Sequence, residues 1–388
     1  MSKSKQHFDC IVIGFGGMGS AAMRYAAMTG RSVLGIDQHG PAHTHGSSHG
    51  QTRVIRKSYF EHPDYVPMLL ESYELWDELN CRHRTNLETK ELLTKCGILQ
   101  IGPPEGEVVQ GVLTSAAAHD LKVEKFTSEQ ISRRLPILNV PDDHEGVFEP
   151  DGGFLRVELC VAAFLKQAMV HGAELMSNTT VTKVQQVDDA RLRVHTTGGE
   201  FSADQVIVTA GAWSSQLLPG LNLPLSVLAK QQHWYQIDRV DNKLVNEFPC
   251  TFFERDDGSS FYVTPELDTL GMKVCEHSGG DQMNDLSQFS GDLSESQKSR
   301  TDEFLEQSFH FTKSRLVHHS MCKYTMTPDS HFLVDRHPEI PQLVFAAGFS
   351  GHGFKFAPVI GKRLVGMLDG ETDPRFDFLK ADRWDVSA

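Results

Sequence analysis

The sequence FDCIVIGFGGMG at residues 8–19 joins a short apolar strand to a cluster of glycines. A helix is expected over residues 17–29, and a second apolar strand over 32–36 ends at Asp37. A strand, a glycine turn, a helix, a second strand and a terminal acid form the pattern of a dinucleotide-binding βαβ unit. The opening of the chain therefore predicts an α/β fold that holds a nucleotide cofactor.

Each glycine of this turn has an expected task. Gly14 would permit the tight turn, Gly16 would let the backbone approach a pyrophosphate, and Gly19 would let the helix pack closely on the strand. The pyrophosphate would lie at the positive N-terminus of the helix. The carboxylate of Asp37 would bind a free ribose 2′-hydroxyl, which fits FAD or NAD and excludes NADP. An ordinary glycine-rich turn without a ligand is the alternative interpretation.

Length and charge narrow the class of protein. A chain of 388 residues exceeds what one core usually supports, so two domains sharing a cleft are expected. The formal charge, 37 − 51 = −14, repels nucleic acids and anionic membranes and favours a small-molecule substrate. The sequence contains neither a membrane-length apolar run nor a signal-peptide core. Its seven scattered cysteines suggest neither zinc nor a disulfide framework and fit a reducing cytoplasm.

Hydrophobic periodicity predicts an α/β core with antiparallel insertions. Strands are expected near residues 8–13, 32–37, 92–101, 180–186, 191–197, 205–210, 259–264, 270–276, 315–324 and 342–347. Helices are expected near residues 17–29, 63–80, 107–119, 128–134, 156–171, 297–309 and 357–368. The apolar stretches at 205–213 and 343–348 would return the chain to the cofactor sheet.

The segment GSSHGQTRVIR, residues 46–56, places Arg53 and Arg56 three residues apart beside small, flexible residues. Such a loop could lie against a cofactor. One guanidinium could pair with a substrate carboxylate, while the other would lend positive charge to an electron-rich ring. A solvated basic loop is the alternative.

Two segments near the C-terminus carry further candidates. In SMCKYTMTPD, residues 320–329, the position of Cys322 after a strand-like run favours a buried structural cysteine. In GFSGHGFKFAP, residues 348–358, three glycines lead into a helix. The N–H groups at the start of that helix would stabilise negative charge on a reduced ring. A structural glycine turn is the alternative there.

Taken together, these segments resemble the monomeric sarcosine oxidase family, which includes N-methyltryptophan oxidase and pipecolate oxidase. The matching segments span nearly the whole chain: the glycine turn, 48–53, 65–67, 149–153, 211–213, 322–325 and 348–356. Members of this family hold FAD through a thioether between the flavin 8α carbon and a cysteine. The resemblance therefore implies covalently bound FAD, with Cys322 as the anchor and Gly351 and Gly353 close to the flavin.

The resemblance also implies roles for individual side chains. Arg56 and Lys355 would bind the substrate carboxylate, and Lys355 would also contact the cofactor. Arg53 would face the flavin. Lys273 would lie over the flavin and promote oxygen reduction, although an exposed lysine at a strand edge is the alternative. Three further active-site side chains are implied: Tyr262, His277 and His49.

The fold implied is a two-domain flavoprotein with a glutathione-reductase-like FAD-binding domain. That domain would comprise residues 1–60, 145–222 and 318–388, and an antiparallel-sheet substrate domain would comprise 61–144 and 223–317. The implied reaction is oxidation of a secondary amine by dioxygen, with sarcosine, another N-methyl amino acid or a cyclic amino acid such as pipecolate as substrate. The products are hydrogen peroxide and an imine that hydrolyses. The resemblance implies a cytoplasmic monomer without a metal, nucleic-acid or membrane partner.

Other functions stay open at this point. One is an oxidase of fructosyl or other N-substituted amino acids, and another is an amine dehydrogenase that passes electrons to a protein partner. A noncatalytic nucleotide-binding module would explain only the first 40 residues or so.

Overall fold

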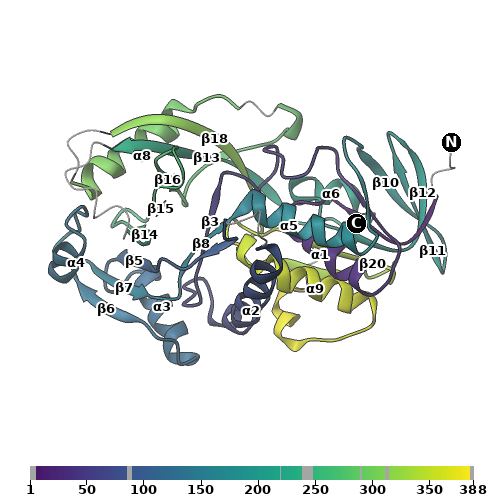
Figure 1. The fold of residues 1–388 in the computed structure, drawn as a ribbon, viewed down its shortest axis with the longest axis horizontal. Helices are drawn as coiled ribbons and strands as arrows, with labels where there is room; N and C mark the ends of the chain where they lie inside the picture. The colour runs from purple at the N-terminus through teal and green to yellow at the C-terminus, as the bar shows by residue number, and fades with distance from the viewer. Residues whose placement is uncertain are drawn as a thin grey trace.

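The computed structural model describes residues 6–84, 90–218, 220–237, 248–288, 291–310 and 314–384. The molecule is elongated, with one large sheet toward each end, as Figure 1 shows. A small antiparallel sheet lies between them and consists of β3 (Thr52–Ile55), β8 (Gly153–Arg156) and β4 (Leu93–Thr94). This small sheet connects the two halves.

The first large sheet has the strand order β10-β11-β12-β1-β2-β9, and β20 and β19 continue it from β12. Its parallel members are β1 (His7–Ile13), β2 (Val33–Ile36), β9 (Glu174–Met176), β12 (Gly199–Val208) and β20 (Leu343–Ala347). Its antiparallel members are β10 (Val181–Asp188), β11 (Arg191–Thr196) and β19 (Leu333–Arg336). The glycine turn after β1 therefore lies at the carboxyl edge of a parallel core, where α/β sheets bind ligands.

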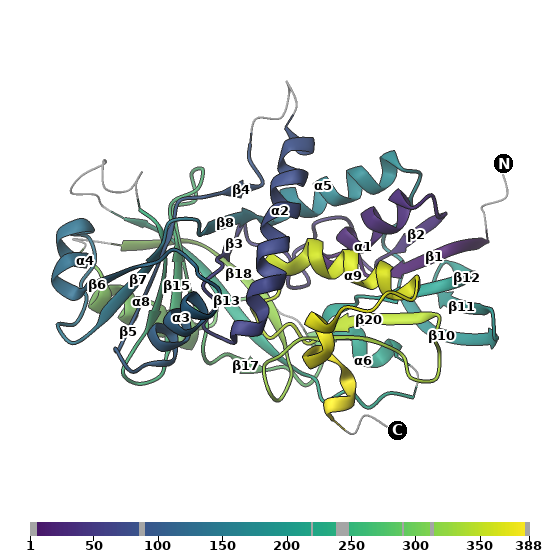
Figure 2. The ribbon, with the colours of Figure 1, turned by 90° about the horizontal axis from the view of Figure 1, so that it is seen from below.

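Both faces of this sheet are buried, which explains why β1 is continuously apolar from Cys10 to Ile13. Cys10 and Val12 belong to the core on the helical side, whereas Ile11 and Ile13 belong to the core on the other side. The helices on the first side are α1 (Gly17–Met28), α5 (Val157–Val170) and α9 (Ala357–Leu368). Figure 2 shows them side by side, with α2 (Val66–His83) crossing near the middle of the molecule.

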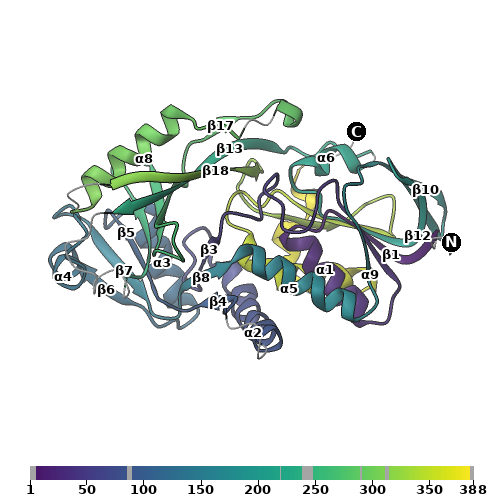
Figure 3. The same ribbon diagram turned by 45° about the horizontal axis from the view of Figure 1, so that its top comes forward.

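The second large sheet has the order β17-β13-β16-β15-β14-β5-β7-β6, and β18 also pairs with β13. Its strands are β5 (Ile98–Gly102), β6 (Glu124–Thr127), β7 (Glu145–Glu149), β13 (Ser226–Ile237), β14 (Cys250–Glu254), β15 (Ser260–Thr264), β16 (Met272–Glu276), β17 (Asp281–Gln282) and β18 (Ser314–Met326). Only β5 and β14 pair in parallel within the described part of this sheet. The long β13–β18 ribbon extends toward the first sheet (Figure 3).

The two faces of this second sheet serve different purposes. Phe261 and Val263 on β15 face a hydrophobic core, in which the ring of Phe261 stacks on Phe304 at a centroid distance of 4.2 Å. Tyr262 lies between them in sequence, so its side chain points to the opposite face, toward the middle of the molecule. The helices around this sheet are α3 (Glu107–Ala118), α4 (Ser128–Arg134) and α8 (Glu295–Ser308).

The fold class predicted from the sequence is confirmed, and all seven predicted helices are present. The single strand predicted over 92–101 is wrong, because Gly97, with a φ of 79°, separates β4 from β5 and the two strands join different sheets. The flexible loop predicted through residue 56 is wrong over 52–55, which form β3 against β8. The division into two domains stays a prediction. Within the described ranges, no helix is long and apolar enough to cross a bilayer.

Candidate active site

The turn after β1 forms one end of the candidate site. Gly14 has a φ of 81°, and a Cβ atom there would lie 2.7 Å from the carbonyl oxygen of Thr209. A Cβ atom on Gly19 would lie 1.8 Å from the carbonyl oxygen of Gly14, so a side chain at Gly19 would force α1 away from the turn, whereas one at Gly14 would collide with Thr209 after β12. Gly16 is the N-cap of α1, and no acidic side chain lies in the described first turn of that helix. The positive end of the helix is therefore suited to an anion.

Asp37 follows β2 and lies beside this turn. Its Oδ2 accepts a hydrogen bond from the N–H of Phe15 at 3.0 Å, and its Oδ1 accepts one from the N–H of His39 at 2.8 Å. These two bonds fix the carboxylate at the rim of the turn. Its role as a ribose ligand stays a prediction.

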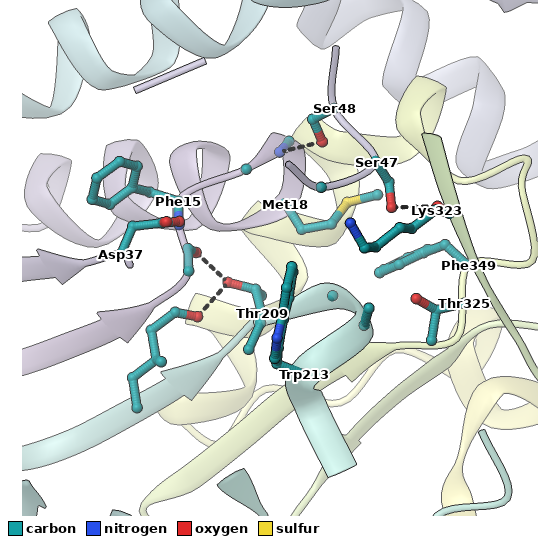
Figure 4. A pocket seen from close by; sticks show the side chains of 18 of the residues that line it. Phe15, Met18, Asp37, Ser47, Ser48, Thr209, Trp213, Lys323, Thr325 and Phe349 are labelled. Atoms are coloured by element: carbon teal, nitrogen blue, oxygen red, sulfur yellow. Dashed lines mark hydrogen bonds between the residues drawn. The ribbon is translucent and has the colours of Figure 1, made fainter. Parts of the chain in front are cut away.

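A large cavity opens next to Asp37 and the glycine turn, and Figure 4 shows the side chains around it. The volume of this cavity is about 190 Å³. Its walls come from the glycine turn, residues 46–48, the turn at Gly211–Trp213, the end of β18 and the loop after β20. The predicted cofactor residues that line it are Gly14, Gly16, Asp37, Cys322, Gly351 and Gly353. Two others lie elsewhere, since Gly19 packs under the turn and Lys355 lines a neighbouring cavity.

The chemistry of this wall fits a dinucleotide with an aromatic end group. The hydroxyl of Thr325 is buried in the wall and has no hydrogen-bond partner among the described residues. Lys323 extends into the cavity in Figure 4, where its Nζ donates to the carbonyl oxygen of His45 at 2.7 Å and lies 5.4 Å from the ring centre of Trp213. An unused hydroxyl, a cation and an aromatic face are the groups that such a cofactor would engage.

Cys322 lies in the wall of this cavity, on β18. Its side chain is almost fully buried, and its Sγ lies 3.4 Å from Nη2 of Arg53. The guanidinium of Arg53 is fixed by two further hydrogen bonds of 2.8 Å, to the carbonyl oxygens of Thr52 and Ser47. The cysteine and the arginine that the resemblance assigns to the flavin are therefore in contact.

A second, smaller cavity adjoins the first and has a volume of about 40 Å³. Both cavities are lined by Arg53, Tyr324, Gly351 and Phe354. The other residues around the smaller cavity are Val54, Arg56, Glu61, Phe252, Tyr262, His277, His352 and Lys355. The structure thus brings together four residues that were predicted at the substrate: Arg56, Lys355, Tyr262 and His277.

The smaller cavity holds an ion pair and a second cation. Nη2 of Arg56 lies 2.7 Å from both carboxylate oxygens of Glu61. Burial by itself would raise the pKa of Glu61, but Arg56, followed by His352 and Lys355, lowers it to about 2. Burial lowers the pKa of Lys355 well below its ordinary value, and Arg56 adds to that effect. A bound anion would therefore relieve the cost of keeping both cations charged in this cavity.

The two histidines that line the smaller cavity, His277 and His352, are neutral near pH 7. Burial, followed by the charge of Lys230, lowers the pKa of His277 to about 3. Burial also lowers the pKa of His352 to about 4, and the hydroxyl of Tyr59 is hydrogen-bonded to Nδ1 of that ring. These imidazoles shape the cavity and do not supply a titrating acid or base near neutral pH.

Lys273 and His49 are absent from the residues that line either cavity. Nζ of Lys273 donates to the carbonyl oxygens of Gly50 at 2.8 Å and Thr52 at 3.0 Å, behind the segment that carries Arg53. No carboxylate lies within ion-pair distance of this ammonium in the described parts of the chain. Burial, followed by the charge of Arg53, lowers the pKa of Lys273 to about 7. His49 is fully buried, and its Nε2 lies 3.2 Å from the carbonyl oxygen of Gly46. Burial, followed by the charge of Arg53, lowers the pKa of His49 to about 3.

Several lining residues were not assigned from the sequence. Tyr324 could have been found, because it lies two residues after Cys322 on one strand and its side chain therefore points the same way. Glu61 lies close to Arg56 in the sequence but carries no local signal of pairing. Phe252 belongs to β14, a strand that the periodicity did not predict.

Comparison with known proteins gives this arrangement a family. The model of the family described as "FAD dependent oxidoreductase" matches residues 9–367. The chain belongs to this family. This FAD-dependent oxidoreductase is 35% identical to monomeric sarcosine oxidase from Bacillus sp. (strain NS-129), with 97% of each chain covered. It is 36% identical to N-methyl-L-tryptophan oxidase from Escherichia coli O139:H28, with 96% of each covered. The resemblance drawn from the sequence motifs is confirmed.

Solved structures agree on the fold of this oxidoreductase. NikD, described as an unusual amino acid oxidase essential for nikkomycin biosynthesis, superposes with a TM-score of 0.84 at 24% identity over 97% of this chain and 98% of its own. Glycine oxidase from Geobacillus kaustophilus gives a TM-score of 0.78 at 18% identity over 98% of this chain and 100% of its own. At these identities the likeness concerns the fold alone.

Proposed function

We propose that this oxidoreductase is an oxidase of small secondary amines that carry a carboxylate, such as sarcosine, other N-methyl amino acids or cyclic amino acids such as pipecolate. The observation that carries the proposal is the smaller cavity, in which Arg56 and Lys355 lie next to the cofactor cavity. The names of the two relatives, a sarcosine oxidase and an N-methyl-L-tryptophan oxidase, support the same class of substrate.

Recognition of the substrate would begin with its carboxylate. Arg56 offers a planar guanidinium and Lys355 a compact ammonium, so the two would hold a carboxylate from different sides. Glu61 occupies the guanidinium in the structure, and the substrate would have to share it or displace Glu61. The small volume of this cavity favours sarcosine or a cyclic amino acid over a fructosyl amino acid.

The other walls would orient the amine. The rings of Tyr262, Phe252 and Tyr324 surround the space beside the two cations, and His277 lies in edge contact with Phe252 at a centroid distance of 5.5 Å. His277 would bind as a neutral ring because of its depressed pKa. The neutral amine would therefore be selected by packing and held in one orientation, without a dedicated acid–base pair.

The cofactor cavity would position FAD through the residues described above. When bound, FAD would supply the two-electron chemistry, by accepting the equivalent of a hydride from the C–H beside the amine nitrogen and passing both electrons to dioxygen to give hydrogen peroxide. Cys322 would be the covalent anchor, and the glycine turn with Asp37 would hold the adenosine end. The ammonium of Lys273 would act through the intervening segment and stabilise the negative charge that develops on dioxygen as it is reduced.

The test is a panel of substrates given to the purified holoenzyme. Sarcosine, N-methyltryptophan, pipecolate, proline and a fructosyl amino acid are mixed with the enzyme without oxygen, and bleaching of the yellow colour is recorded. Air is then admitted and peroxide is measured. We expect rapid bleaching by a small acid and stoichiometric peroxide. Bleaching without peroxide would instead indicate a dehydrogenase, and bleaching by the fructosyl compound alone would refute the proposed substrate.

We further propose that the enzyme is a cytoplasmic monomer, which size-exclusion chromatography and cell fractionation would test.

A further inference from the structure

Two cysteines that are distant in sequence have their sulfur atoms in contact. Sγ of Cys96 lies 3.9 Å from Sγ of Cys250, although 154 positions separate them. Cys96 lies between β4 and β5, and Cys250 is the first residue of β14, which pairs in parallel with β5. The N–H of Cys250 donates to the carbonyl oxygen of Gly97 at 3.1 Å, so the backbone also holds the two residues together.

The two thiols differ in the way that an attacking thiol differs from its resolving partner. Cys96 is partly exposed, whereas Cys250 is fully buried. The hydrogen bond from Cys250 lowers the pKa of Cys96, while burial raises the pKa of Cys250 well above its ordinary value. An oxidant would therefore meet the more acidic thiol first, with a protonated thiol directly behind it.

The other described cysteines lack this combination. Cys81 is exposed on α2, and the pKa of Cys10 is raised to about 12 by burial. Cys160, Cys275 and Cys322 are buried, and none of these five cysteines has a second sulfur in contact among the described residues. Any oxidation through a thiol pair would therefore fall on Cys96 and Cys250.

We propose that Cys96 and Cys250 are an oxidation site at which hydrogen peroxide closes a disulfide bond beside the substrate cavity. The thiolate of Cys96 attacks one peroxide oxygen, the O–O bond breaks, and hydroxide leaves with the bonding pair to give a sulfenic acid. The sulfur of Cys250 then attacks that of Cys96, an S–S bond forms, the S–O bond breaks, and water leaves. In total two thiols lose two electrons and two protons, and one peroxide is reduced to two waters.

The position of the pair connects this oxidation to the substrate. An S–S bond is about 2.05 Å long, so closing it brings the two sulfurs roughly 1.9 Å closer than the 3.9 Å of the dithiol. Cys250 and Phe252 are two residues apart on β14, and their side chains therefore lie on the same face of the strand. Because Phe252 is a wall of the smaller cavity, a shift at the start of β14 is transmitted to that wall. The peroxide would be the product of the proposed function, so the inference rests on that function for its natural oxidant.

The test supplies hydrogen peroxide as a reagent, so that it works even if the proposed activity fails. Holoenzyme is treated with a few equivalents of peroxide, denatured, alkylated and digested with trypsin. We expect loss of two alkylatable thiols and a linked species of peptides 96–122 and 244–255, lighter by two hydrogens than their sum. Dithiothreitol should separate them. Recovery of both peptides as free, alkylated thiols after peroxide treatment would overturn the proposal.

Matched variants sharpen the result. Cys96→Ser should remove the linked species, and Cys81→Ser, which changes an exposed cysteine outside the pair, should leave it intact. If Cys250→Ser does not fold because that site is fully buried, Cys96→Ser carries the test. In an active preparation, the KM for the amine should rise about threefold or more on linking and return on reduction. A KM that stays constant while the peptides link would overturn the connection to the substrate cavity.

Discussion

Replacing Arg56 by glutamine tests how this enzyme would recognise a carboxylate. Nη2 of Arg56 lies 2.7 Å from both oxygens of Glu61 in a nearly fully buried site, so the guanidinium is already oriented toward an anion. A charge-assisted hydrogen bond in such a site is worth about 1.5–3 kcal/mol. Loss of this hydrogen bond in Arg56→Gln would raise the dissociation constant of the substrate by roughly 10- to 150-fold.

The single variant also leaves a carboxylate without its partner. Glu61 would keep its negative charge near Lys355 and repel the incoming substrate, so the effect of Arg56→Gln should lie at the upper end of that range. The double variant Arg56→Gln/Glu61→Gln removes the repulsion and should regain about tenfold of the lost affinity. This difference separates recognition of the substrate from a general loss of structure.

The assay is stopped-flow bleaching of the bound flavin without oxygen, at increasing concentrations of sarcosine and of its neutral amide. The concentration dependence gives the dissociation constant, and the plateau gives the rate of reduction. Wild-type enzyme should strongly prefer the acid, and the variants much less. If Arg56→Gln keeps the full preference for the acid over the amide, Arg56 does not hold the carboxylate and the reasoning fails.

Three further outcomes follow from the same geometry. Acid-precipitated wild-type protein should stay yellow and Cys322→Ser should release its flavin into the supernatant; a colourless wild-type precipitate would rule out the covalent link. Lys273→Met should slow reoxidation of the flavin by oxygen and spare its reduction by substrate, and equal losses in both half-reactions would contradict this role. The wild-type reoxidation rate should also fall as the pH rises through about 7, because this buried ammonium then loses its proton. Burial lowers the pKa values of His49, His277 and His352 to between about 3 and 4, below the ordinary 6.5, so the unfolded chain takes up protons that the folded protein does not. Stability should therefore fall below pH 6.5 by about 1.4 kcal/mol per pH unit for each histidine, a loss that denaturant titrations at pH 7 and pH 5 would measure and that should be smaller in His49→Asn.

The sequence by itself determined the features that rest on local geometry. The glycine turn and Asp37 could be predicted because the positive φ of Gly14, the close approach of Gly19 to Gly14 and the acid after β2 all lie within one βαβ unit. Helices such as α9 could be read because their apolar face repeats along one segment. The family could be recognised because its motifs are short continuous segments.

Only the tertiary structure decided which distant groups meet. β13 was not predicted, because Lys230, Gln231 and His233 are polar and yet buried, with hydrogen-bond partners in the loop after β16 and in α8. Periodicity detects apolar faces, and it cannot detect a polar face whose partners come from elsewhere in the chain.

The same reason applies to the site. The neighbourhood of Arg56 and Lys355 depends on the packing of β3 against the short helix Phe354–Phe356, and the contact between Cys96 and Cys250 depends on the pairing of β5 with β14. Residue type limits what each side chain can do chemically. Whether a cysteine is a lone buried thiol or half of a reactive pair is decided by a distance of a few ångströms, which only the packing of segments remote in sequence can set.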